Sequence, residues 1–286
     1  MLLPVIGQIL ASQIVSNPGA AVIADWAARV VTNGGAAPST ATKTALNTFY
    51  NGLISAGLST KFKSINCFVP DNLIASLTPL IVGTGGNDPW TNNGPFTSGD
   101  LTVNGLTGNG SSKYLDTGLQ PKNIFVYTNM ATTQYLYSVG TGTSPFGSTY
   151  QVGGPPLIQN NVSATGYLLD FPIESAVACR INLTFANSGG YFCNNRAAAN
   201  SVEIFRATSA VPHASIGTNT NTCINYIIPN NRPFFIYAVN INTSPGQYFN
   251  GTISFMSFHD SVTIGQSAIL YSLVQTMRQQ LGGGYI

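Results

Sequence analysis

The stretch that decides the fold is Arg180–Cys193, which reads RINLTFANSGGYFC. Apolar and polar residues alternate over Ile181–Phe185, and a period of two is typical of a strand with one buried face. Asn187–Gly190 has the composition of a tight turn, and the apolar run Tyr191–Cys193 follows it. This order predicts a β-hairpin that joins the strand at 180–185 to the strand that begins at Tyr191.

The same pattern of short apolar runs and turn residues extends on both sides of this stretch. From residue 83 to about residue 260, short apolar runs are separated by Gly, Pro, Asn and Ser, which predicts a sandwich or barrel of antiparallel strands. Two of the predicted strands, Phe234–Val239 and Ile124–Tyr127, are apolar on both faces. Their outward faces need cover, which either the N-terminal helices of the chain or a neighbouring subunit could supply.

Helices are predicted at both ends of the chain. Asn17 with Pro18 is typical of a helix start, and helices are expected over residues 18–32, 39–56 and 70–80. Thr263 and Gln266 have the spacing of a capping box, which predicts a C-terminal helix that ends at the glycines 282–284. We expect three parts: an apolar arm at 1–16 that docks on this protein or on a neighbour, a helical segment at 17–82, and a β-sandwich with its C-terminal helix at 83–286.

The composition argues against several classes of function. The 286 residues are 44% hydrophobic but only 7% charged, whereas an ordinary soluble domain has about 25% charged residues. The net charge of +2 is not gathered into a basic run, so nucleic acid is not expected as a partner. The apolar start is too short to span a bilayer, and membrane insertion is not expected. A polar but uncharged surface suits permanent packing against neighbours, or contact with sugar hydroxyls.

The four cysteines are expected to be free core residues. Reduced cysteines fit assembly in a bacterial cytoplasm. Cys67, Cys179, Cys193 and Cys223 have no C-x-x-C spacing, which makes a zinc site of the usual kind improbable. Asn87–Asp88 and Asp116 could offer oxygens to calcium, but in turns such side chains usually bond their own backbone. We therefore predict no obligatory metal, and no cofactor, because no phosphate-binding glycine motif is present.

The sequence gives little evidence for a group of catalytic residues. A glycosidase needs two carboxylates across a bound sugar, and Asp170 with Glu174 is interrupted by Phe171-Pro172. Glu203 is expected to pair with Arg206 or another surface base. His213 lies in a loop, and His259 precedes Asp260, but adjacent strand residues point to opposite faces and do not form a dyad. The sequence predicts no enzyme and assigns no catalytic residue.

Sugar binding is the chemistry for which a local candidate exists. Trp90 lies beside Asn92 and Asn93, and an aromatic ring next to amide groups is the arrangement that stacks on a sugar ring while bonding its hydroxyls. The competing interpretation makes Trp90 a core residue, and it is the one we favour because large aromatic side chains are mostly buried.

One region resembles a known family. Trp90-Thr-Asn-Asn-Gly94, Leu101-Thr-Val-Asn-Gly105 and the run from Gly108 to Pro121 are similar to a stretch of structural and tail-associated proteins of tailed bacteriophages. The segments preceding residue 69 and from Ile253 to Leu281 are similar too. The resemblance implies a concanavalin A-like (laminin G-like) jelly roll in a virion, and it carries over no catalytic residues.

Taken together, the expectation is a mainly β protein, an antiparallel jelly-roll β-sandwich with an N-terminal helical segment and a C-terminal helix. Its expected function is that of a bacteriophage virion structural protein, tail- or capsid-associated and assembled in the bacterial host cytoplasm. Its expected partners are other virion proteins and copies of itself, with a host surface glycan as a further possibility. The alternatives are a glycan-binding host-attachment module and a polysaccharide hydrolase. The ligand-binding residues stay unknown at this point.

Overall fold

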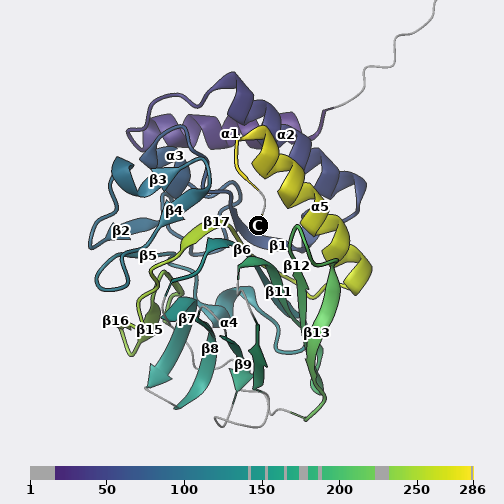
Figure 1. Cartoon of the computed structure of the whole chain (residues 1–286). Coiled ribbons are helices and arrows are strands. Elements are labelled where there is room, and N and C mark those ends of the chain that lie inside the picture. The colour runs from purple at the N-terminus through teal and green to yellow at the C-terminus, as the bar shows by residue number, and fades with distance from the viewer. Residues whose placement is uncertain are drawn as a thin grey trace, which may run out of the picture.

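The structure is a computed structural model of the whole chain (Figure 1). It describes residues 17–140, 143–151, 154–163, 166–173, 180–185, 189–222, 232–284 and 286. The predicted arm at 1–16 lies outside the described residues, as do Cys179, Cys223 and Glu174.

The three N-terminal helices and the C-terminal helix that the sequence predicts are present, and a short helix at Pro121–Ile124 was not predicted. The helices are α1 (Gly19–Thr32), α2 (Thr40–Ser55), the short α3 (Leu73–Leu77) and α4 (Pro121–Ile124), and the C-terminal α5 (Ile264–Gln280), with 3-10 turns η1 (Ser59–Lys61) and η2 (Ser98–Asp100). The Ser39 hydroxyl caps α2 by accepting the Thr42 N–H at 3.1 Å. The capping box of α5 is confirmed, since Thr263 and Gln266 bond each other's backbone N–H groups.

Two sheets form the sandwich. The first, sheet A, has the order β13 (Ala214–Asn219), β12 (Ser201–Ala207), β11 (Gly190–Ala198), β6 (Met130–Ser138), β17 (Thr252–His259), β4 (Gly105–Thr107), β3 (Leu101–Thr102), with β1 (Phe62–Asn66) also beside β17. The second, sheet B, has the order β10 (Ile181–Thr184), β9 (Gly166–Ile173), β8 (Gly154–Ser163), β7 (Thr143–Gln151), β14 (Phe235–Ile236), β5 (Tyr114–Asp116), β2 (Thr91–Asn93), and includes β15 (Val239–Ile241) and β16 (Ser244–Gly246). All described strand pairs are antiparallel except β15 with β7, so the predicted antiparallel sandwich is confirmed.

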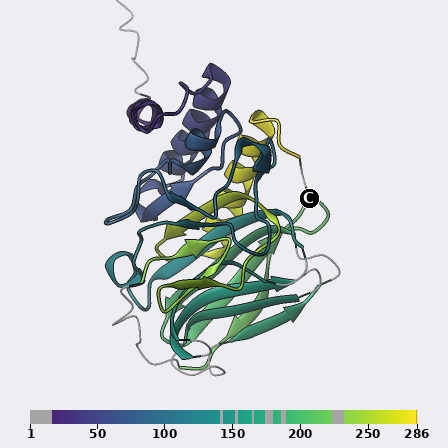
Figure 2. The ribbon, with the colours of Figure 1, turned by 90° about the vertical axis from the view of Figure 1, so that its left-hand side faces the viewer.

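The molecule has three layers, because helices cover the face of sheet A that sheet B leaves open (Figure 2). One core fills the space between the sheets, and its larger members include Trp90, Leu115, Phe146, Phe192, Phe234 and Phe258. A second core lies between sheet A and the helices, and its larger members include Trp26, Phe49, Tyr135, Tyr191, Phe255 and Leu270. Sheet A is therefore buried on both faces, and all eight residues of β17 are buried.

This arrangement settles what covers the two-sided apolar segments. Each residue of Phe234–Val239 is at most 5% exposed within this chain alone. The need for a neighbouring subunit, which the burial argument left open, therefore does not arise at this segment. The prediction of one strand over Phe234–Val239 was wrong, because a bend at 237–238 separates β14 from β15. Ile124–Tyr127 is not a strand, and that prediction was wrong: Pro121 begins the short helix α4, and Val126 is 63% exposed.

The predicted hairpin was also wrong, although both of its strands exist. β10 pairs with β9 in sheet B, whereas β11 pairs with β6 and β12 in sheet A. The chain thus passes from one sheet to the other between these strands. Alternation identifies a strand with one buried face, but it does not say which strand lies beside it.

Residues before the predicted boundary at 82 also contribute to the sandwich, through β1. Ile65 and Asn66 of β1 pair with Ser257 and Met256 of β17, so the helical segment contributes a strand to sheet A. Within the part of the chain that the structure describes, no helix combines the length and apolar character needed to cross a bilayer.

Candidate functional site

Trp90 is a core residue, as the favoured interpretation predicted. It is 1% exposed, and its ring packs edge-on against Phe68 with 6.0 Å between the centroids. The Asn92 side chain accepts the Phe96 N–H at 2.7 Å and donates to the Phe96 carbonyl at 2.9 Å, which organises the following loop. Trp90 and Asn92 therefore build the fold and offer nothing to a ligand.

The opposite face of the same strands is different. Leu115 and Ile236 point into the core, so their neighbours in β5 and β14 point outward. Register places β2 against β5 and β5 against β14, and Tyr248 approaches from the segment after β16. We call this outward group the tyrosine platform, and it comprises Thr91, Asn93, Tyr114, Asp116, Phe235 and Tyr248.

The rings of the platform pack together over a buried base. Phe235 is 5% exposed, and the Tyr114 ring lies on it with 4.6 Å between centroids and an interplanar angle of 36°. The Tyr248 ring meets the Tyr114 ring edge-on, with 6.4 Å between centroids and an interplanar angle of 60°, and both tyrosines are half-buried. A half-exposed ring that is held by a buried neighbour offers a rigid apolar surface at little cost in side-chain entropy.

Polar groups lie at the same strand positions as these rings. Asn93 pairs with Tyr114 across β2 and β5, and Thr91 pairs with Asp116. Asn93 donates to the Thr91 carbonyl at 3.2 Å, and Asp116 accepts the Gly118 N–H at 2.8 Å. The Asp116 bond is the turn contact expected from its sequence. The second carboxylate oxygen and the amide oxygen are left to accept a ligand's hydroxyl groups.

The electrostatics of the platform are set by partial burial. Burial raises the pKa of the Asp116 carboxyl above its usual range, against the Gly118 N–H, which lowers it. Burial also raises the pKa of the Tyr114 hydroxyl, helped by the nearby Tyr248 and Asp116. The Tyr114 hydroxyl therefore stays protonated at neutral pH and can donate as well as accept hydrogen bonds.

The remaining carboxylates do not assemble a glycosidase centre among the described residues. Asp170 is fully buried and is bound by Arg180 at 2.7 Å. A pocket of about 360 Å³ beside the start of α5 is lined by Glu203 and Lys61, which gives it one carboxylate. The hydrolase criterion of two opposed carboxylates is not met in the described pockets, and whether the chain is an enzyme stays a prediction.

Glu203 does not pair with Arg206, and that expectation was wrong. The two residues are three positions apart in β12, so they lie on opposite faces of sheet A. Arg206 points into the sandwich, where its guanidinium lies over the Phe185 ring at 4.3 Å and donates to the Gly189 carbonyl at 3.0 Å.

His259 is a buried structural residue, and no dyad forms with the side chain of Asp260. Its Nδ1 lies 2.8 Å from the main-chain carbonyl of Asp260, and its Nε2 lies 2.9 Å from the Thr133 hydroxyl. A carbonyl can only accept, so Nδ1 carries the proton and Nε2 accepts from Thr133. The Asp260 carboxylate instead pairs with Lys63 at 3.0 Å. Burial lowers the pKa of His259 to about 4.

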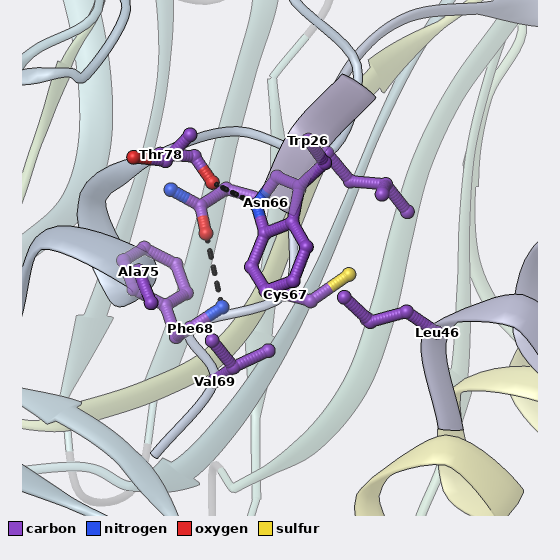
Figure 3. Close-up of a pocket in the computed structure, with 9 residues that line it drawn as sticks. Trp26, Leu46, Asn66, Cys67, Phe68, Val69, Ala75 and Thr78 are labelled. Atoms are coloured by element: carbon purple, nitrogen blue, oxygen red, sulfur yellow. Dashed lines mark hydrogen bonds between the residues drawn. The ribbon is translucent and has the colours of Figure 1, made fainter. Parts of the chain in front are cut away.

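Cys67 and Cys193 are free and buried, as predicted for them. Figure 3 shows Cys67 in the junction between α1, α2 and sheet A, beside Trp26. The Trp26 Nε1–H donates to the Thr78 carbonyl at 3.0 Å, and Asn66 accepts the Phe68 N–H at 2.9 Å. This space has no room for a water molecule, so it is packing and not a binding site.

The two aspartates that could bind calcium have contacts within the protein. Asp88 pairs with Arg29 at 3.0 Å, and Asp116 bonds its own turn. Within the described ranges, no group of three or more His, Cys, Asp or Glu side chains gathers as metal ligands would.

Comparisons with known proteins give structural similarity only. No family model and no curated protein matches the sequence. The CBM40 domain of the IT-sialidase of Ruminococcus gnavus is 12% identical with a TM-score of 0.38, over 50% of this chain and 81% of that one. The NanB sialidase of Streptococcus pneumoniae is 10% identical with a TM-score of 0.43, over 57% of this chain and 26% of that one. At these scores the matches assign no ligand or activity to this chain.

Proposed function

We propose that the chain is a glycan-binding module and that the tyrosine platform is its binding surface. The observation that supports this function is the half-exposed Tyr114 ring on the buried Phe235, with Tyr248 beside it and with amide and carboxylate oxygens on the same face. A sugar ring has an apolar face, which stacks on an aromatic side chain, and hydroxyl groups at its edge, which need hydrogen-bonding partners. The platform supplies both.

The side chains of this surface on β2, β5 and β14 have complementary roles in binding a sugar. Tyr114 provides the stacking surface and Tyr248 lies edge-on beside it. The Asp116 carboxylate accepts from hydroxyl groups at the rim, and the Asn93 amide can accept from them or donate to them. Asn93, Tyr114 and Asp116 lie on strands, which hold them more rigidly than a loop would and lower the entropy cost of binding.

A glycan array with purified chain tests the proposal, followed by calorimetric titration of each oligosaccharide that binds. Tyr114→Ala removes the stacking surface, and we expect binding to weaken about tenfold, because 1.4 kcal/mol corresponds to a factor of ten. Tyr50→Ala is the matched control, since Tyr50 is equally half-buried but lies on α2. An array without any binding, or equal affinities for Tyr114→Ala and wild type, would refute the proposal.

The setting of this module in a bacteriophage particle is a separate proposal that rests on the sequence resemblance. The low charge of the chain, 7% of residues, supports a subunit that is packed among neighbours. Mass spectrometry of purified particles tests it. Detection of the chain at a fixed stoichiometry supports a virion role, and its absence from intact particles contradicts it.

A further inference from the structure

The charge at the tyrosine platform is negative. Asp116 is the ionisable carboxyl of the group, and among the described residues its side chain is in no ion pair. It bonds the Gly118 N–H with one oxygen. A partly buried carboxylate is screened less by salt than one on an open surface.

The basic side chains of the protein are engaged elsewhere. Lys113 is adjacent to Tyr114 in sequence, but its side chain points the other way, toward Asp100 and over the Phe96 ring at 5.7 Å. Arg232 precedes Phe235 by three residues and bonds the Asn242 side chain. Others pair with carboxylates (Arg29, Lys63, Arg180), lie buried against rings (Arg196, Arg206, Arg278), or line pockets away from β5 (Lys43, Lys61, Lys122).

From this distribution we propose that the tyrosine platform selects uncharged glycans and discriminates against glycans that carry a carboxylate or sulfate group. This inference rests on the proposed function and names its ligand class. An acidic sugar stacked on Tyr114 brings its negative charge close to Asp116, and like charges at that range repel in a partly desolvated site. A neutral sugar instead offers hydroxyl groups that the Asp116 carboxylate accepts as charge-assisted hydrogen bonds.

The burial that raises the pKa of Asp116 supports the same selection, since a desolvated carboxylate gains more from a hydroxyl donor and loses more beside a second anion. Selection against acidic ligands does not depend on shape. The selection follows from the negative charge of Asp116, and a single isosteric substitution of this residue should therefore remove it.

The experiment compares matched oligosaccharide pairs that differ only in a terminal acidic sugar or a sulfate, on wild type and on Asp116→Asn. For wild type we expect each acidic partner to bind at least tenfold more weakly than its neutral counterpart at low salt. In Asp116→Asn the ratio should fall to about threefold or less, because the asparagine keeps the oxygen that accepts Gly118 but carries no charge. Asp100→Asn is the control, since Asp100 is paired with Lys113, and its ratio should stay that of wild type.

The outcomes separate the two proposals. Equal or tighter binding of the acidic partners, or an unchanged ratio in Asp116→Asn, overturns the selection for uncharged glycans and leaves glycan binding intact. Failure of both neutral and acidic glycans to bind overturns the proposed function and this inference together. Thermal melting of each variant confirms that the comparison is made on folded protein.

Discussion

Acidification should weaken the fold through one buried histidine. His259 is 0% exposed in β17, and it is neutral because burial opposes its charged form and Lys61 and Lys63 add to that effect. Its Nε2 accepts from the Thr133 hydroxyl, and protonation removes that acceptor. In the unfolded chain the same imidazole is hydrated and takes up a proton at its ordinary pKa.

The magnitude follows from the two pKa values. The pKa falls from 6.5 to about 4 on folding, and each unit corresponds to 1.36 kcal/mol, which gives a contribution of about 3 kcal/mol. The sign is that of a depressed pKa: the contribution is fully present above pH 6.5 and is lost as the pH falls from 6.5 toward 4. Below pH 4 both states are protonated, and His259 adds no further slope.

Urea unfolding of wild type and His259→Gln at pH 7.5, 6, 5 and 4 measures this contribution. Glutamine can still bond the Thr133 hydroxyl but does not titrate. Between pH 7.5 and 4 the free energy of unfolding of the variant should therefore fall by about 3 kcal/mol less than that of wild type. Carboxylates that titrate in the same range are common to both proteins and cancel in the difference. Equal losses, or an imidazole that titrates near pH 6.5 in the folded protein by NMR, would refute the reasoning.

Two smaller predictions concern the cap of α2 and the buried thiols. Ser39→Ala should lower the free energy of unfolding by about 1 kcal/mol, because the Thr42 N–H loses its acceptor. Thr48→Ala, at an exposed position of the same helix, should change it by less than about 0.5 kcal/mol. Urea unfolding measures both values, and equal effects would contradict the role of Ser39 as a cap. Burial raises the pKa of the Cys193 thiol to about 11 and that of the Cys67 thiol further. A thiol reagent at pH 8 should therefore leave both cysteines unlabelled until the protein unfolds, as peptide mapping would show. Rapid labelling of either cysteine in the native protein would contradict their burial.

The helices could be predicted from the sequence because their signals are local. Ser39, Thr263 and Gln266 bond groups three residues away, and those bonds form regardless of the tertiary structure. The partner of each strand is not local. The sequence around Gly190 predicts a hairpin, yet the chain leaves sheet B there and enters sheet A, where β6 and β12 are its neighbours.

The candidate site was missed for a related reason. Trp90 drew attention because it lies beside Asn92 and Asn93, whereas the half-exposed aromatic ring is Tyr114, on the strand that pairs with β2. The alternation Tyr114-Leu115-Asp116 indicates that an aromatic ring and a carboxylate share one face of a short strand, and that signal was available. Phe235 and Tyr248, more than 100 positions further along the chain, could be added only once the sheet was assembled.

The central claim is that a sugar contacts the tyrosine platform, and mapping by NMR of the contact with a neutral oligosaccharide tests it most directly. Adding the oligosaccharide should shift the ring signals of Tyr114 and Tyr248 and the amide signals of Asn93 and Asp116, and leave those of the Lys61 and Glu203 pocket unchanged. Shifts confined to that pocket, or saturating binding that leaves both tyrosine rings unperturbed, would contradict the account.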